Sequence, residues 1–158
     1  MRSESMTVEE LERFLAAEFP QVFHPESGLA IETLWDGGCR VRQAFRAASL
    51  RPGGTISGPT LMGLADFTMY VAVLAAIGPV PLAVTINLNI NFLRRPGPHD
   101  VVAEGRLLKL GKRLATGEVT IRCDGDDDPV AHAQRPIRSR RMAGELGRRY
   151  YKTIYARH

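Results

Sequence analysis

The hydrophobic pattern near the start of the chain predicts a short helix over residues 8–18. Thr7 stands just before this stretch and Glu10 follows it at capping-box spacing, so the helix start is marked in the sequence. Pro20 lacks a backbone N–H and ends the pattern. The apolar positions that form one stripe are Val8, Leu11, Phe14, Leu15 and Phe19.

Two extended segments follow, over residues 29–35 and 39–47. The turn between them, residues 36–38, has the sequence Asp-Gly-Gly, whose glycines accept a positive φ, so the two segments are predicted to form a hairpin. Residues 49–58 contain one proline and three glycines. Such a stretch is too rich in breaking residues for regular structure, and we expect a loop there.

The next segment, residues 58–77, is the longest apolar run in the chain and predicts a buried helix. Pro59 suits the first helical position, where a missing N–H costs nothing. Residues 84–92 then alternate apolar and polar side chains without a break, which indicates one half-buried strand.

Three more strands are predicted at 101–110, 114–123 and 129–137. The segments between them, residues 111–113 and 124–128, are rich in glycine and charge and have the composition of turns. The three strands should therefore run as an antiparallel meander.

This order of elements predicts an α+β fold. A helix that is apolar nearly all round must be covered nearly all round, and a six-stranded antiparallel sheet wrapped around it does so. An open sheet also leaves edges, which favour pairing with a second copy of the chain.

Composition limits the chain to one ordinary globular domain. It has 158 residues, of which 44% are hydrophobic and 24% charged, so disorder and repeat architectures are excluded. Two cysteines cannot form a disulfide framework, and the first residues lack the apolar core of a signal peptide, so we expect a cytoplasmic protein. The run 58–77 is nearly long enough to cross a bilayer, but Asp66 near its centre favours the core of a soluble protein, and we expect no membrane association.

Charge is concentrated in the last part of the chain. Residues 135–158 carry eight basic side chains against Glu145 alone, so the rest of the chain is net negative. Such a tail is most often solvated, although it is also the pattern of a nucleic-acid-binding arm. We expect no nucleic-acid partner. The four histidines and two cysteines form no ligand spacing, so we expect no metal and no cofactor.

Asp66 and Gly58 are the residues most suggestive of chemistry. A carboxylate inside an apolar helix needs hydrogen bonds or a function, so Asp66 either points to solvent or bonds a neighbouring backbone group, or it is a general base. Gly58 lies at the predicted helix start, where unpaired N–H groups attract a negative charge such as a developing oxyanion, although it is equally well explained as a simple helix-start glycine.

These two residues cannot serve one carbonyl from the same chain. They are eight positions apart, which is roughly 12 Å along a helix axis. If a twofold axis set two such helices antiparallel, Gly58 of one copy would face Asp66 of the other, and two equivalent sites would result.

At this point the sequence resembles the hotdog-fold acyl-CoA thioesterases of the phenylacetate-pathway (PaaI-like) type. The resemblance covers about residues 28–139 and rests on four short motifs that occur in order. These motifs are Gly58-Pro-Thr-Leu-Met-Gly-Leu-Ala-Asp66, the strand and turn at 84–96, Ala103-Glu104 and the segment 110–114.

The resemblance implies a sheet wrapped around a central helix, a dimer that often pairs into a homotetramer, and hydrolysis of a coenzyme A thioester. It implies that Asp66 activates the attacking water or attacks directly, and that the N–H of Gly58 polarises the thioester carbonyl. Thr85, at the start of the following strand, is implied to assist the aspartate.

The sequence departs from the family pattern near the helix start. The family usually has His-Gly-Gly where this chain has Ser57, Gly58 and Pro59, and it often has asparagine where this chain has Arg51. The proline removes one N–H but not that of Gly58, whereas Arg51 brings a charge and a longer reach. We therefore expect Arg51, Ser57 and Pro59 to contact substrate and to alter catalysis.

Two pairs of basic residues are expected to bind the phosphates of coenzyme A. Arg94 and Arg95 lie at a strand end, and Lys112 and Arg113 lie in a turn, at positions that resemble those used by family members. Basic residues in surface turns also commonly meet only solvent.

Together these observations predict an acyl-CoA thioesterase with an N-terminal helix and connector at 1–27, a hotdog domain at 28–139 and a basic tail at 140–158. The main alternative is a hotdog protein that binds acyl-CoA without turnover, which Arg51 and Ser57 favour. A hydratase-like reaction on an enoyl-CoA lacks the Asp/His pair it needs in the helix motif, and a nucleic-acid module would depend on the tail.

Overall fold

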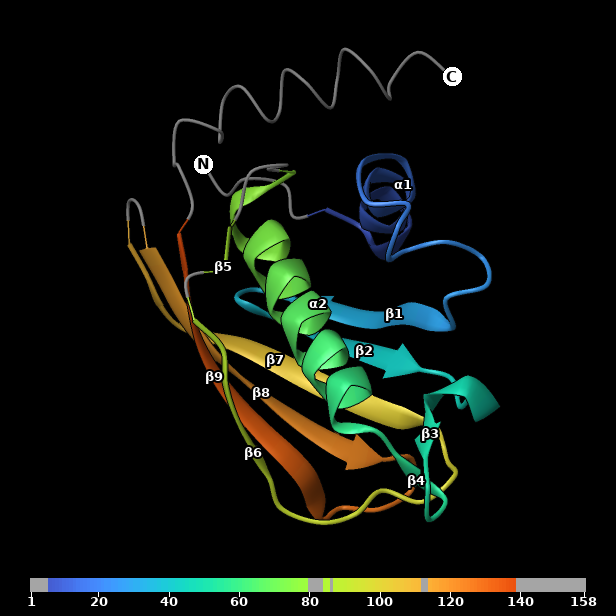
Figure 1. The fold of residues 1–158 in the computed structure, drawn as a ribbon. Coiled ribbons are helices and arrows are strands. Elements are labelled where there is room, and N and C mark those ends of the chain that lie inside the picture. The colour runs from blue at the N-terminus through green and yellow to red at the C-terminus, as the bar shows by residue number, and fades with distance from the viewer. Residues whose placement is uncertain (1–5, 80–83, 86, 112–113, 139–158) are drawn as a thin grey trace.

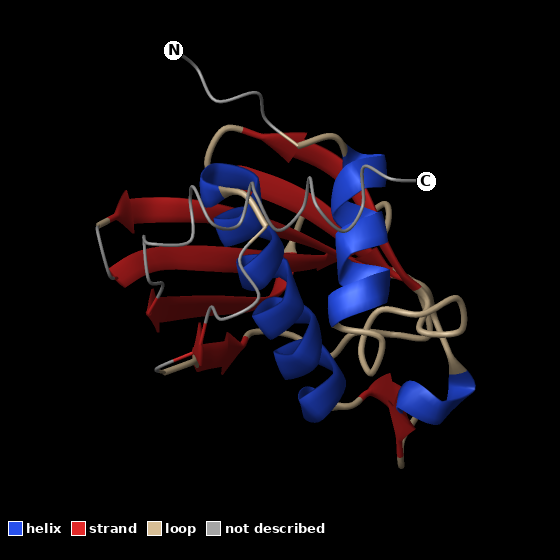
Figure 2. Cartoon of the chain, turned by 90° about the horizontal axis from the view of Figure 1, so that it is seen from above, coloured by secondary structure: helices blue, strands red, loops and turns tan. Residues whose placement is uncertain are grey.

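A computed structural model describes residues 6–79, 84–85, 87–111 and 114–138, and in it one long helix lies in the hollow of a curved antiparallel sheet (Figure 1). Figure 2 shows the shorter N-terminal helix on the same side of the sheet. The elements are α1 (Val8–Glu18), β1 (Leu29–Trp35), β2 (Gly38–Gln43), the short 3-10 turn η1 (Ala47–Ser49), β3 (Leu50–Arg51), β4 (Thr55–Ile56), α2 (Gly58–Ile77), β5 (Val84–Thr85), β6 (Asn89–Phe92), β7 (Val101–Leu110), β8 (Leu114–Cys123) and β9 (Pro129–Arg138).

The large sheet has the strand order β1-β2-β7-β8-β9-β5, and β6 also pairs with β9. All its pairings are antiparallel, and β7, β8 and β9 form the predicted meander. The sheet therefore has the six positions that the sequence predicts, with the last position filled by two short strands in the described part of the chain.

The division of the last position is a correction to the single strand predicted at 84–92. Thr85 pairs with Ile137 and Asn89 pairs with Gln134, so four steps along the outer strand oppose three along β9. An extra residue of this kind interrupts a ladder. Hydrophobic alternation does not reveal the interruption, because the alternation continues through it.

The loop predicted at 49–58 is more ordered than its composition suggests. β3 and β4 pair across a tight turn in which Gly53 and Gly54 have φ values of 102° and 76°. The glycines are the reason for the turn, since they adopt this left-handed region without strain. The following helix begins at Gly58, so Pro59 occupies its second position, one later than predicted.

The inner face of the sheet packs against α2. Helix α2 is long and apolar enough to cross a membrane by length and composition alone. In the structure it contacts β2, β7 and β8, and its side chains from Leu61 to Leu74 are mostly buried. It is therefore the core helix of this fold.

The outer face of the sheet is polar and carries cross-strand ion pairs. Arg42 of β2 contacts Glu32, Asp100 and Asp124. Glu118 of β8 accepts hydrogen bonds from Arg106 and pairs with His132 at 3.1 Å, and these two partners lower the pKa of Glu118. The polar outer face and apolar inner face together fix the register of the strands.

Helix α1 has the capping box that its sequence predicts. The Thr7 N–H donates to Glu10 Oε2 at 2.9 Å, and the Glu10 N–H donates to Thr7 Oγ1 at 3.2 Å. Leu11, Phe14 and Leu15 are fully buried in the same core as α2. Helix α1 thus forms part of the main core.

Candidate active site

The N-terminus of α2 presents an N–H group that no described residue accepts. Ser57 is the N-cap in extended conformation, but its side chain does not cap the helix and instead lies 2.8 Å from Thr60 Oγ1. The first helical backbone bond runs from Leu61 N to Ser57 O at 3.3 Å. The Gly58 N–H therefore has no acceptor among the described residues, at the end of the helix where negative charge is favoured.

An aromatic ring lies beside this helix end. A Cβ at Gly58 would be 3.4 Å from Phe92 Cζ of β6, so the ring packs against the glycine backbone. Phe92 itself is 51% exposed. A half-exposed aromatic side chain next to an uncapped N–H provides an apolar wall for a group bound there.

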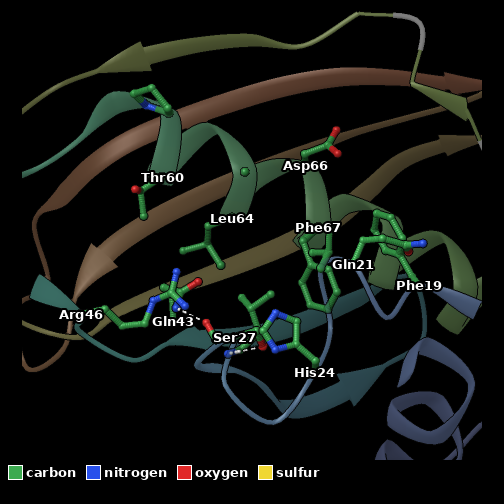
Figure 3. Close-up of a pocket in the computed structure, with 14 residues that line it drawn as sticks. Phe19, Gln21, His24, Ser27, Gln43, Arg46, Thr60, Leu64, Asp66 and Phe67 are labelled. Atoms are coloured by element: carbon green, nitrogen blue, oxygen red, sulfur yellow. Dashed lines mark hydrogen bonds between the residues drawn. The ribbon is translucent and has the colours of Figure 1, made fainter. Parts of the chain in front are cut away.

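Asp66 lies about two turns further along α2, between the buried residues Ala65 and Phe67. Its side chain is half-buried, so it is not the fully solvent-exposed carboxylate that one explanation of the sequence allowed. In Figure 3 the Asp66 carboxylate projects from α2 away from Leu64 and Phe67, at the edge of a cavity whose lining includes Asp66. Gly58 and Asp66 are eight positions apart, which places them roughly 12 Å apart along the axis.

The cavity has a volume of about 300 Å³ and lies between α2 and the connector that joins α1 to β1. Its apolar lining includes Phe19, Val22, Leu29, Leu64 and Phe67. Its polar lining includes Asp66, His24 and Arg46 (Figure 3). A cavity lined by apolar side chains together with several polar groups, a carboxylate among them, has the character of a small-molecule site.

The connector is the part of this site that the sequence analysis missed. The sequence indicated only a connector after the N-terminal helix, with no assigned role. The available signal was its pair of phenylalanines, Phe19 and Phe23, in a segment otherwise typical of a surface loop.

The two arginines expected to bind phosphate differ in their surroundings. Arg94 Nη2 is 2.5 Å from Asp126 Oδ2, and Arg94 Nη1 is 3.6 Å from Asp128 Oδ2. The hydrogen bond from the Asp128 N–H to the Asp126 carboxylate is the main cause that lowers the pKa of Asp126, and the hydrogen bond from Arg94 lowers it further. Arg95 is exposed and forms no ion pair within the described residues.

Arg51 lies on a segment next to Arg95. It is exposed in β3, and the β3–β4 hairpin is joined to the Arg95 segment by a hydrogen bond from Ile56 N to Pro96 O at 3.2 Å. Lys112 and Arg113, the other predicted phosphate ligands, lie outside the described residues.

The remaining predicted site residues are placed as follows. Pro59 is exposed on α2 and lines the cavity, and Ser57 is half-buried at the helix start. Thr85 lies in β5 opposite Ile137 of β9. The structure thus brings Ser57, Gly58 and Pro59 together at one end of α2.

No cluster of three or more His, Cys, Asp or Glu side chains suitable for a metal ion occurs in the part of the chain that the structure describes. Cys39 is fully buried, and burial raises the pKa of its thiol to about 12. A thiol of this kind is inert as a nucleophile.

The family model and the solved structures that match this chain indicate the same family. A model described as the thioesterase superfamily matches residues 53–130, which include the whole of α2. A candidate thioesterase from Silicibacter sp. TM1040 is 36% identical, with a TM-score of 0.76 over 84% of this chain and 91% of that one. No curated protein matches the chain.

Two further solved structures are similar. A point mutant of the phenylacetic acid degradation protein PaaI from Thermus thermophilus is 27% identical, with a TM-score of 0.63 over 80% of this chain and 97% of that one. Zebrafish thioesterase superfamily member 2 is 18% identical, with a TM-score of 0.74 over 85% of this chain and 99% of that one, and shows the shared fold. The chain therefore belongs to the thioesterase superfamily of hydrolases and has the hotdog fold.

Proposed function

We propose that this protein is an acyl-CoA thioesterase whose active sites form between two copies of the chain. The observation that carries the proposal is the pairing, on one apolar helix, of an uncapped N-terminal N–H at Gly58 with a half-buried carboxylate at Asp66. The first group stabilises an oxyanion and the second accepts a proton, which are the two requirements of thioester hydrolysis.

Two copies are needed because of the distance along the helix. One turn of α2 beyond Gly58, the exposed residues Met62 and Gly63 leave this side of an apolar helix uncovered in the single chain. A side chain at Gly63 would meet nothing within 4 Å. An antiparallel α2 from a second copy would cover this surface and would set its Gly58 opposite Asp66.

The proposed reaction begins with a water molecule between Asp66 and the thioester. Asp66 removes a proton as the water oxygen attacks the carbonyl carbon, and the carbonyl oxygen becomes an oxyanion held by the Gly58 N–H of the second copy. The C–S bond then breaks, and the coenzyme A sulfur leaves with the proton from Asp66. Direct attack by Asp66 would instead form an anhydride that water then hydrolyses.

Neighbouring residues refine this arrangement. Pro59 has no N–H, so Gly58 is the principal oxyanion donor, and Ser57 orders the helix start through Thr60. We assign Thr85 the role of orienting the water beside Asp66, on the basis of the family resemblance.

The phosphates of coenzyme A are assigned to exposed arginines near the start of α2. Arg95 and Arg51 lie on segments joined by the Ile56–Pro96 hydrogen bond, and both are exposed. Arg94 is already engaged by two aspartates and is a weaker candidate. Lys112 and Arg113 remain candidates from the sequence.

The test of the proposal is the Asp66→Asn variant, assayed against a panel of acyl-CoA substrates. Loss of the general base should lower kcat by about 10²–10⁴. Asp36→Asn, in the exposed turn between β1 and β2, serves as the matched control and should keep full activity. Wild-type turnover by Asp66→Asn on a substrate that the protein cleaves would refute the assignment.

The alternative of binding without turnover gives a different result. In that case the wild-type protein would bind acyl-CoA in calorimetry and would cleave no member of the panel. The departures from the family pattern at Arg51 and Ser57 are the reason to include this measurement.

A further inference from the structure

The connector between α1 and β1 is held against α2 by two aromatic contacts. Phe23 stacks on Phe67 of α2 with ring centroids 5.9 Å apart and an interplanar angle of 3°. Phe19 meets Tyr70 of α2 edge-on at 6.1 Å. Aromatic pairs in these geometries stabilise beyond the area they bury. The connector is thus fixed to the face of α2 that carries Phe67 and Tyr70.

A buried amide holds the other end of the connector. Gln43 of β2 donates from Nε2 to Ser27 O at 2.9 Å and to Ala44 O at 3.2 Å, and the Ala44 N–H donates to Gly28 O at 2.8 Å. Gly28 has a φ of 74°, and a Cβ there would lie 2.9 Å from Gln43 Nε2. These buried hydrogen bonds, and a backbone conformation that requires glycine, fix the connector in place. We call the connector the wall of the cavity.

The wall and α2 border an open cavity of about 300 Å³, whose lining includes Asp66. The buried side chains of Ser27 and Gln43 already form hydrogen bonds. Gln43 Nε2 donates to Ser27 O, and Ser27 Oγ accepts from Leu29 N at 3.2 Å. His24 is the one half-buried polar side chain of the wall without a hydrogen bond in the described part of the chain. The interior therefore offers apolar contacts beside several polar groups, among them the His24 ring.

We propose that this cavity is the acyl-binding site and that the connector sets the length of the acyl group. This inference rests on the proposed thioesterase function, because it places the acyl chain beside Asp66. A cavity of 300 Å³ is at the small end of ligand sites and holds about ten water-sized atoms. The substrates are therefore acyl groups of about ten non-hydrogen atoms or fewer, with an apolar body that lies against Val22 and Phe67.

The test changes the depth of the cavity in both directions at Val22, a half-buried residue of the wall. The measurement is kcat/KM for straight-chain acyl-CoA substrates from acetyl to palmitoyl. In the wild type, kcat/KM should rise about fourfold per methylene up to octanoyl or decanoyl and should fall beyond that length. Val22→Ala should move the optimum to longer chains, and Val22→Phe should move it to shorter ones.

Val8→Ala is the matched control, because Val8 is also a partly buried valine packed on the core but does not line the cavity. It should leave the optimum unchanged. Thermal melting of each variant identifies any that do not fold. An optimum that neither Val22 variant moves, or a wild-type kcat/KM that continues to rise to palmitoyl, would overturn the inference.

Direct binding separates this inference from the proposed function. The dissociation constants of the same substrates are measured by calorimetry with Asp66→Asn, or with the wild type if it cleaves nothing. A length limit that moves with Val22, without any turnover, would support the cavity and refute the enzyme. Turnover with no length preference in kcat/KM or binding would support the enzyme and refute the cavity.

Discussion

Arg94 and Arg95 illustrate how two identical neighbouring side chains acquire different roles. Arg94 is bound by Asp126 and Asp128 of the β8–β9 turn, whereas Arg95 forms no ion pair within the described residues. An arginine whose charge is already compensated gains little from a phosphate, because it must give up its partners first. Under the proposed function, Arg95 is therefore the residue of the pair that would bind a phosphate of coenzyme A.

We predict that Arg95→Gln raises KM for acyl-CoA by about threefold to tenfold at low ionic strength, with kcat little changed. A phosphate contact made equally in ground and transition states affects KM alone. Arg94→Gln is the matched control and should leave KM near the wild-type value. Equal effects of the two substitutions on KM, or no effect of either, would contradict this division of roles.

The sequence identified this site in part. Asp66 stood out because a carboxylate in an apolar helix is costly, and Gly58 stood out because it begins that helix. The sequence could not separate Arg94 from Arg95, since the distinguishing aspartates lie about thirty residues away and meet Arg94 only in the fold. It missed the connector for the same reason, because Phe67 and Gln43 give that segment its structure.

At the scale of elements, the position of α2 depends on small residues in the sheet beneath it. Gly117 of β8 lies under Met69, and a Cβ there would lie 2.2 Å from Met69 Cε and 2.8 Å from the backbone oxygen of Arg106. The methionine end can shift, but the backbone oxygen cannot do so without disturbing the β7–β8 ladder. A side chain at this position therefore displaces Met69 of the helix and disturbs the β7–β8 ladder.

Gly117→Ala should accordingly lower the free energy of unfolding by about 1–3 kcal/mol, which corresponds to a drop in Tm of about 2–4 °C per kcal/mol. Thr116→Ala, on the opposite face of the same strand, is the control and should have a smaller effect. Thermal denaturation of both variants measures the difference. A Gly117→Ala protein as stable as the wild type would show that the helix–sheet spacing adjusts freely.

The elements themselves were predictable where one periodicity extends over many residues. The helix α2 and the strands β7 and β8 have the predicted bounds, apart from Pro59 standing one position later in its helix. The exceptions are local. The strand predicted at 39–47 is β2 and ends at Gln43. In addition, β5 and β6 are separated by an extra residue, and β3 and β4 are only two residues long each. Neither feature leaves a periodic signal, because one continues the alternation and the other is too short to show any.

At the scale of the whole molecule, the proposed site requires two chains, since Gly58 and Asp66 lie roughly 12 Å apart on one helix. The Gly58 N–H can be removed cleanly. Proline is accepted at a helix start, and the preceding Ser57 is already extended, with φ −67° and ψ 149°. Gly58→Ala keeps the N–H and adds a Cβ at ordinary contact distance, 3.4 Å, from Phe92 Cζ, so it is the matched control.

We predict that Gly58→Pro lowers kcat by about 10²–10³, and that Gly58→Ala has a much smaller effect.

When equal amounts of Gly58→Pro and Asp66→Asn are unfolded and refolded together, half of the dimers should contain one chain of each kind. In every mixed dimer one of the two sites combines a native Gly58 with a native Asp66 from the other chain. Activity should therefore recover to about a quarter of the wild-type value. A site contained in one chain predicts no recovery, because each variant chain lacks one of the two groups.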